Sequence, residues 1–132
     1  MKQRSVITVE VSPGELLDRI TILEVKAARI TDPAKLRNVG SELATLQAAR
    51  DRALTSSPEL DGLAAELKSV NEALWDIENE IRSCERRQDF GSRFVELARS
   101  VYVTNDRRSA IKRQINSATG SRLVEEKSYP EY

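Results

Sequence analysis

The stretch of sequence that decides the fold is PELDGLAAELKSVNEALWDIENEIRSCER, residues 58–86. Its apolar residues recur at alternating spacings of three and four, which is the seam of a coiled coil. At 1.5 Å per residue this helix is about 45 Å long, so it needs packing partners along its whole length. We expect the two preceding helices, laid antiparallel, to cover part of it and a second copy of the chain to cover the rest. The seam consists of Leu60, Leu63, Leu67, Val70, Leu74, Ile77, Ile81 and Cys84.

Short capping signals mark the starts of three helices. Ser12, Asp32 and Ser57 each precede a proline, and this pair combines an N-cap with a residue suited to the first turn. The signals predict helices over residues 13–30, from residue 33 to the break at residues 55–57, and over residues 58–86. Gly40 lies within the second helix. It either lowers the stability of that helix by up to about 1 kcal/mol relative to alanine or marks a close contact with another helix.

The segments outside these helices carry weaker signals. A fourth helix is expected from about Phe94 to Ala118, either continuous or restarting at Asn105, with Gly120 closing it. Residues 5–11 alternate and are rich in β-branched side chains, which predicts a short strand. The tail, residues 121–132, either pairs with that strand or is simply extended. The expected fold is therefore all-α, an antiparallel bundle of long coiled-coil-like helices, with a two-stranded β element from the termini left open.

Composition narrows the classes of function. The 132 residues predict one domain, and 39% hydrophobic with only 5% aromatic residues favours long helices. The 21 basic and 21 acidic side chains cancel, which disfavours nucleic acid or an anionic membrane as partner. The polar start of the chain, the lack of a long apolar run and the single cysteine predict a cytoplasmic protein.

The chain lacks residues that are common in catalytic and metal sites. The chain has no histidine, which excludes Ser-His-Asp and Cys-His arrangements and histidine-containing metal sites. No glycine-rich phosphate loop is present, and we expect no metal and no cofactor. Cys84 falls on the apolar seam, where a free thiol is expected to be buried and inert.

A polar row beside the seam of the third helix is the first candidate site. Residues at spacings of four, three and four share one face, and their position predicts partial burial. The row is either a salt-bridge and hydrogen-bond layer that fixes helix register, or a ligand or partner pocket with Trp75 as its apolar wall. Its members are Asn71, Trp75, Glu78 and Arg82.

The first helix carries a similar arrangement. Glu24 lies beside its apolar stripe, and Lys26 lies a little further around the cylinder. We expect Glu24 to form an ion pair with Arg82 or Arg29, as a structural contact or as part of a binding site.

The densest polar segment lies in the fourth helix. Asn and Asp weaken a helix interior, and two adjacent arginines beside a helix start would suit an anion such as a phosphate or carboxylate. The alternative is an ordinary solvated face. The residues concerned are Tyr102, Asn105, Asp106, Arg107, Arg108 and Lys112.

Three stretches together resemble a known family. They are residues 12–26 (SPGELLDRITILEVK), 70–78 (VNEALWDIE) and 94–108 (FVELARSVYVTNDRR), and the likeness extends to residues 124–129. The set resembles a family of small bacterial proteins, domain of unknown function family 6165. The resemblance implies a single helical domain with no assigned chemistry. Members accompany glycosyltransferase or surface-polysaccharide genes, which implies a link to envelope polysaccharide synthesis.

Two functions follow from these observations. The first is a non-catalytic helical homodimer that binds a partner protein as an adaptor. The second is a small enzyme or metabolite-binding bundle for a carboxylate or sugar phosphate, in the style of helical chorismate mutases. The second function predicts that four cationic side chains converge on one enclosed cavity, with Glu24 or Glu78 beside them. The four are Arg82, Arg107, Arg108 and Lys112.

Overall fold

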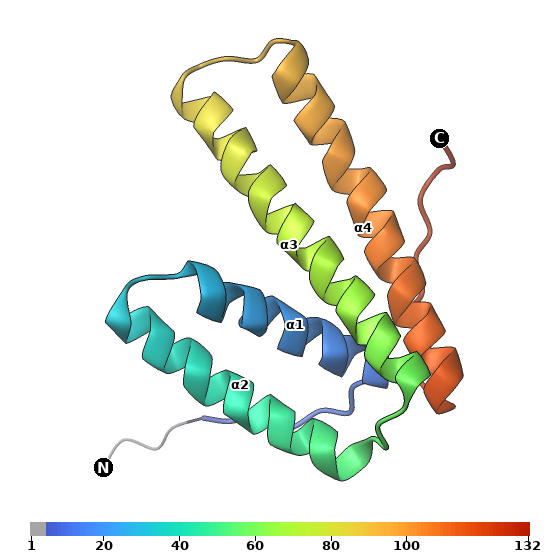
Figure 1. The fold of residues 1–132 in the computed structure, drawn as a ribbon. Coiled ribbons are helices and arrows are strands. Elements are labelled where there is room, and N and C mark those ends of the chain that lie inside the picture. The colour runs from blue at the N-terminus through green and yellow to red at the C-terminus, as the bar shows by residue number, and fades with distance from the viewer. Residues whose placement is uncertain (1–4) are drawn as a thin grey trace.

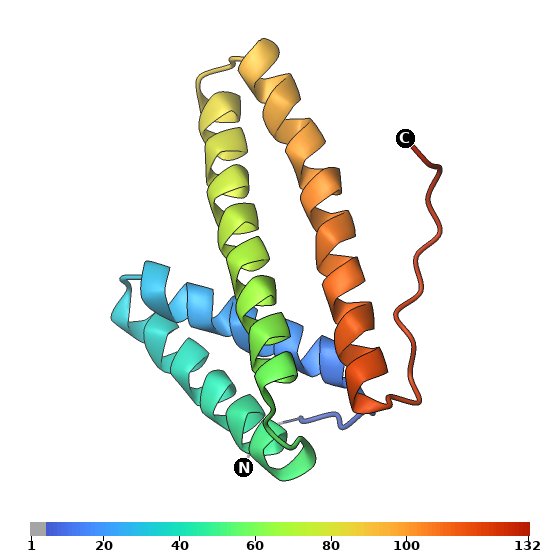
Figure 2. The same ribbon diagram turned by 45° about the vertical axis from the view of Figure 1, so that its right-hand side comes forward.

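The computed structural model describes residues 5–132, which form four α-helices. Figures 1 and 2 show two helical hairpins that cross, with the far half of the second hairpin projecting beyond the first. The first hairpin joins α1 to α2, and the second joins α3 to α4. The all-α prediction is therefore confirmed. The helices are α1 (Pro13–Arg29), α2 (Pro33–Ala53), α3 (Pro58–Arg86) and α4 (Ser92–Thr119).

The predicted capping signals form as expected. The side chains of Ser12, Asp32 and Ser57 accept hydrogen bonds from backbone N–H groups three residues later, at 3.1, 3.0 and 3.1 Å. α4 runs without a break through Asn105 and ends at Gly120, whose φ of 67° lies in the left-handed region that suits glycine. Local chemistry thus determines where α1, α2 and α3 begin and where α4 ends.

The central element is α1, the shortest helix. It packs against each of the other three, whereas α2 packs closely only against α1 among the described helices. Leu17, Ile20 and Val25 are all buried, and they point to more than one side of the helix. The expectation that both early helices lie antiparallel along α3 is therefore wrong. Only α1 lies against α3, and the two run in the same general direction (Figure 1).

Most of the cover over the α3 seam comes from α4 instead. The two helices form a long antiparallel hairpin, in which Leu67 and Val70 of α3 and Leu97 of α4 are buried. Cys84 is also buried, as predicted. Between Val70 and Cys84 the seam residues are only half-buried; they are Leu74, Ile77 and Ile81.

The strand predicted over residues 5–11 does not form, and of the two alternatives for the tail the extended one is found. Residues 5–132 contain no strand, and Val6 and Ile7 are 87% and 86% exposed. A strand needs a partner backbone, and the tail runs back along α4 rather than beside residues 5–11 (Figure 2). An ion pair between Arg122 and Glu10 connects the two segments. Residues 1–4, which belong to the polar start used for the cytoplasmic prediction, lie outside the described residues.

No helix within residues 5–132 combines the length and the apolar character needed to cross a bilayer.

Candidate functional site

A group of buried and half-buried charges lies where α1, α4 and the tail meet; we call it the ionic cluster. Lys112 is only 4% exposed, and its Nζ donates a hydrogen bond to Oε2 of Glu15 at 2.8 Å. The same Nζ lies 3.3 Å from Oε1 of Glu125 and 3.8 Å from Oδ2 of Asp18. Arg108 completes the cluster, with Nε 3.6 Å from Oδ2 of Asp18. A buried charge is tolerated only with such partners.

The carboxylate of Asp18 joins this cluster to α3. Its Oδ1 accepts a hydrogen bond from Nδ2 of Asn71 at 3.0 Å, and the same amide group donates to Oγ1 of Thr21 at 3.0 Å. The hydroxyl of Thr21 in turn donates to the carbonyl of Asp18 at 2.9 Å. Asp18, Thr21 and Asn71 are all buried. Asn71 therefore belongs to a structural layer, one of the two alternatives predicted for its row.

Lys112 keeps its charge in this setting. Burial by itself lowers the pKa of a lysine, because it disfavours the charged form. The hydrogen bond to Glu15 and the negative charges of Asp18, Glu15 and Glu125 act in the opposite direction. Together they raise the pKa of Lys112 above its ordinary value, so the amine is a structural cation at neutral pH.

The first turn of α1 contacts the backbone of α4 directly. The N–H of Gly14 donates to Oδ1 of Asn116 at 2.8 Å. A Cβ at residue 14 would lie 2.6 Å from the carbonyl oxygen of Lys112 and 2.8 Å from Oδ1 of Asn116. Glycine is therefore required at this position by close approach, and this approach places Glu15 and Asp18 beside Lys112.

A groove of about 330 Å³, which we call the Trp75 groove, opens at the junction of α1, α3 and α4. It contains the whole polar row predicted on α3 together with Arg108 of α4, which the sequence assigned to a separate segment. At its rim, Arg82 donates to Glu78 at 3.3 Å. The lining residues are Ile22, Val25, Asn71, Leu74, Trp75, Glu78, Asn79, Arg82 and Arg108.

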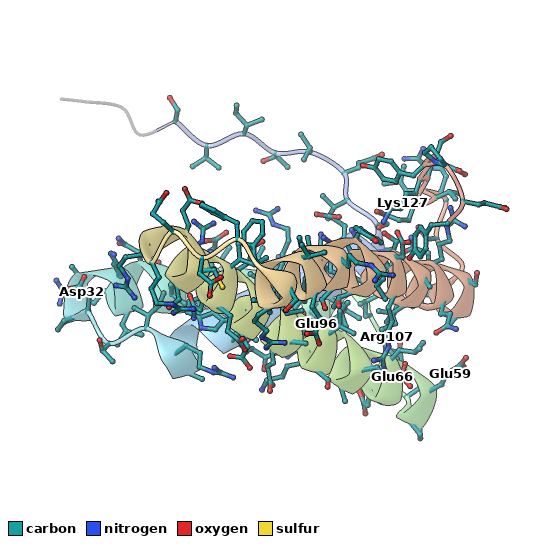
Figure 3. All side chains as sticks on the ribbon, turned by 90° about the horizontal axis from the view of Figure 1, so that it is seen from above. Asp32, Glu59, Glu66, Glu96, Arg107 and Lys127 are labelled. Carbon is teal, nitrogen blue, oxygen red and sulfur yellow. The ribbon has the colours of Figure 1, made fainter. Side chains whose placement is uncertain are left out.

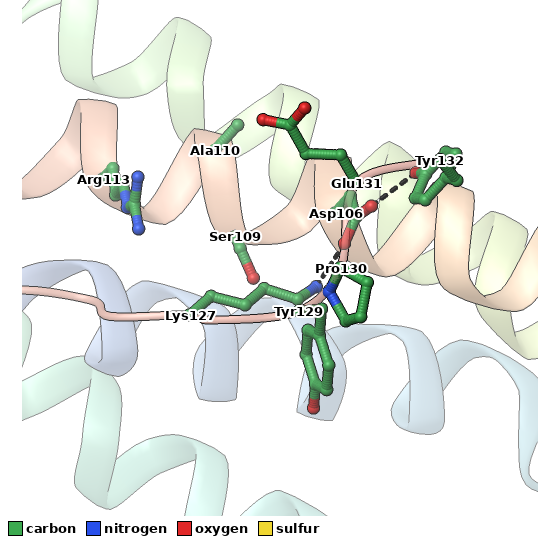
Figure 4. A pocket seen from close by; sticks show the side chains of 9 residues that line it. All are labelled: Asp106, Ser109, Ala110, Arg113, Lys127, Tyr129, Pro130, Glu131 and Tyr132. Atoms are coloured by element: carbon green, nitrogen blue, oxygen red, sulfur yellow. Dashed lines mark hydrogen bonds and ion pairs between the residues drawn. The ribbon is translucent and has the colours of Figure 1, made fainter.

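The tail forms two further grooves with the outer side of α4. Asp106 accepts hydrogen bonds from Lys127 and from the hydroxyl of Tyr132 (Figure 4). The hydrogen bond from Lys127 and then that from Tyr132 hold the pKa of Asp106 below its usual range. The neighbouring groove, of about 640 Å³, includes Tyr102 and Asn105. This part of the predicted polar segment therefore contacts the tail of its own chain.

The other predicted site residues lie apart from these groups. Glu24 is 4.0 Å from Lys68, not paired with Arg82 or Arg29 as predicted, because Arg29 instead binds Asp76 at 2.8 Å. Lys26 is half-buried near the end of α1, where its carbonyl accepts a hydrogen bond from the N–H of Ile30 at 2.8 Å.

The predicted cavity with four converging cations does not form. Arg82 and Arg108 line the Trp75 groove, but Lys112 is enclosed in the ionic cluster. Arg107 is exposed and lies on the opposite side of α4 from Lys127 in Figure 3. The prediction fails because Arg107 does not line the groove that Arg108 lines, and because the carboxylates of the ionic cluster bind Lys112.

Sequence reasoning missed most of the ionic cluster. Glu15, Asp18 and Glu125 were not singled out from the sequence. One signal was present: α1 is apolar on two sides, which is typical of a helix enclosed by others, and a carboxylate on such a helix needs a buried partner. No comparable signal marked Glu125, because it lies in a segment without periodicity.

Among the residues that the structure describes, no group of acidic or cysteine side chains is arranged to hold a metal ion. Residues 7–131 match the protein family described as "Family of unknown function (DUF6165)", and the chain therefore belongs to that family. No curated protein and no solved structure matches the chain.

Proposed function

We propose that this member of a family of unknown function is a non-catalytic interaction protein that forms a homodimer through α4. The observation that carries the proposal is an exposed apolar stripe near the α3–α4 loop, which we call the outer α4 stripe. Phe90, Val95 and Tyr102 are 49%, 52% and 43% exposed. The stripe consists of one half-buried residue, Phe94, and four exposed ones, Phe90, Val95, Ala98 and Tyr102.

The spacing of the stripe suits a second helix. Val95, Ala98 and Tyr102 are separated by three and four residues, the repeat of a helix–helix seam. The tail covers the outer side of α4 only as far as Tyr102, whose ring meets that of Tyr132 edge-on at 5.1 Å. The seam of α3, by contrast, is mostly occupied by α4. We therefore place the surface for a partner on α4.

A second copy of the chain fits this surface. Two antiparallel copies of α4 related by a two-fold axis near Ala98 would place Val95 against Tyr102 of the partner subunit. The small side chain of Ala98 at the centre permits close approach of the two helices. The formal net charge of zero means that two copies have little long-range repulsion to overcome.

The non-catalytic part of the proposal is supported by the ionic cluster. A catalytic acid or base usually has a pKa shifted towards neutrality and a face open to substrate. Lys112 instead has a raised pKa and three carboxylates within 3.8 Å. The cluster therefore acts as a structural element that holds α1, α4 and the tail together.

The family resemblance extends the proposal to an adaptor role in the cytoplasm, beside envelope polysaccharide synthesis. Deleting the gene is then expected to reduce surface polysaccharide, measured by quantifying extracted polysaccharide. Unchanged polysaccharide would contradict this extension without affecting the proposed dimer.

Val95→Glu is expected to convert the dimer to a monomer, because it places a charge in the middle of the apolar contact. Sedimentation equilibrium should give twice the monomer mass of 14.8 kDa for the natural chain and the monomer mass for the variant. Val103→Glu is the matched control, since Val103 is 50% exposed but points about 100° away from Tyr102 around the helix. A natural chain that is strictly monomeric at micromolar concentration would rule out the proposal.

A further inference from the structure

Arg108 has hydrogen-bonding capacity that the described protein does not use. A guanidinium carries five N–H donors, and they match carboxylate and phosphate oxygens in pairs. Nε of Arg108 lies 3.6 Å from Asp18, beyond hydrogen-bond distance, and the group makes no hydrogen bond to any residue within 5–132. Its side chain is 31% exposed and lines the Trp75 groove.

The negative charge of Asp18 is not compensated by Arg108 alone. Its carboxylate already accepts a hydrogen bond from Asn71 and lies 3.8 Å from the Lys112 amine. Arg108 can therefore direct its remaining N–H groups to a ligand while Asp18 stays compensated. The walls of the groove itself carry two guanidiniums, those of Arg82 and Arg108, against the single carboxylate of Glu78. The carboxylate of Asp18, which lies beside Arg108, is not among the lining residues, so the lining itself carries one net positive charge.

The rest of the groove is suited to an apolar or ring-shaped body. Trp75, Leu74, Ile22 and Val25 supply apolar walls from two different helices. An aromatic side chain with a polar group a short distance away is typical of ligand sites. The volume of about 330 Å³ is at the lower end for such sites, so a dinucleotide is too large and a small metabolite is of suitable size.

We propose that the Trp75 groove binds a small organic anion. Its carboxylate or phosphate group is held by Arg108, and its ring or apolar body lies against Trp75. The site is separate from the outer α4 stripe and does not depend on the proposed dimer.

The chain contains its own reporter for this binding, because Trp75 is its one tryptophan. We would titrate the protein with benzoate, phenyl phosphate and glucose 1-phosphate and follow the tryptophan emission. At least one of these probes is expected to give a saturable change below about 10 mM. Benzoate and phenyl phosphate have the same ring, so comparing them shows which anionic group Arg108 prefers. Inorganic phosphate has no ring or apolar part and shows whether that part is needed for binding.

Arg108→Gln is expected to weaken binding about tenfold or more, because hydrogen bonds to a charged group usually contribute at least this much to binding affinity. Arg107→Gln is the matched control and is expected to bind like the natural chain, because Arg107 does not line the groove. Arg108→Lys retains a positive charge near Asp18 but lacks the planar fork, so it separates loss of binding from loss of folding. Thermal unfolding of each variant verifies that it is folded.

Two results would overturn the proposal: no saturable change with any of the three organic probes, or equal binding by the natural chain and a folded Arg108→Gln variant. The monomeric Val95→Glu variant is expected to bind the probe as well as the natural chain. The two experiments therefore test the proposed dimer and the proposed anion binding separately.

Discussion

Replacing Lys112 with methionine is expected to destabilise the fold by about 3–5 kcal/mol, as is usual when one partner of a buried ion pair is removed. Methionine fills similar space but leaves the buried carboxylate of Asp18 without its closest ammonium group. Urea unfolding followed by circular dichroism measures the loss. Arg107→Met, on the exposed side of the same helix, is expected to change stability by no more than about 0.5 kcal/mol. A loss below about 1 kcal/mol in the Lys112 variant would show that the cluster is not stabilising.

The same residue predicts a pH dependence. The pKa of Lys112 is raised by folding, so its contribution to stability is complete below the unfolded value of about 10.4 and is lost as the pH rises through the folded value. The difference in unfolding free energy between the natural chain and Lys112→Met should therefore be constant near neutrality and shrink in alkali. A difference that is equal on both sides of about pH 10.4 would contradict this assignment.

Gly14→Ala is expected to destabilise the protein by about 1–3 kcal/mol, the usual cost of inserting a methyl group where there is no room. The new Cβ would lie 2.6 Å from the carbonyl oxygen of Lys112, so α1 must move away from α4. Gly40→Ala is the control, because a Cβ there has no neighbour within 4 Å. That change is expected to stabilise α2 by up to about 1 kcal/mol. Equal melting temperatures for the two variants would contradict the close contact at Gly14.

The positions of the helices were predictable because their signals are local. Ser12 caps α1 through a group three residues away, and Gly120 ends α4 through its own φ. The strand predicted over residues 5–11, which does not form, shows the limit of local signals. The β-branched pattern of residues 5–11 is real, but a strand also needs a partner backbone, which no local pattern can guarantee.

For the candidate site, the sequence predicted which residues of one helix lie on the same side, but not which helices come together. The spacing of Trp75, Glu78 and Arg82 placed them on one side of α3, and the structure gathers them in one groove. That Arg108 joins them depends on how α3 and α4 pack, which no residue spacing specifies. The same is true of Glu125, whose place beside Lys112 results from the path of the tail.

The ionic cluster also constrains how the chain is made. Lys112 and Glu15 are separated by 97 positions, and Gly14 and Asn116 by 102. During synthesis from the N-terminus, α1 emerges long before the residues that neutralise and enclose it. Asp18 and the side of α1 that faces α4 therefore stay in water until α4 and Glu125 have left the ribosome. Contacts of such long range slow folding, so this chain should fold more slowly than helical bundles whose neighbours in space are neighbours in sequence.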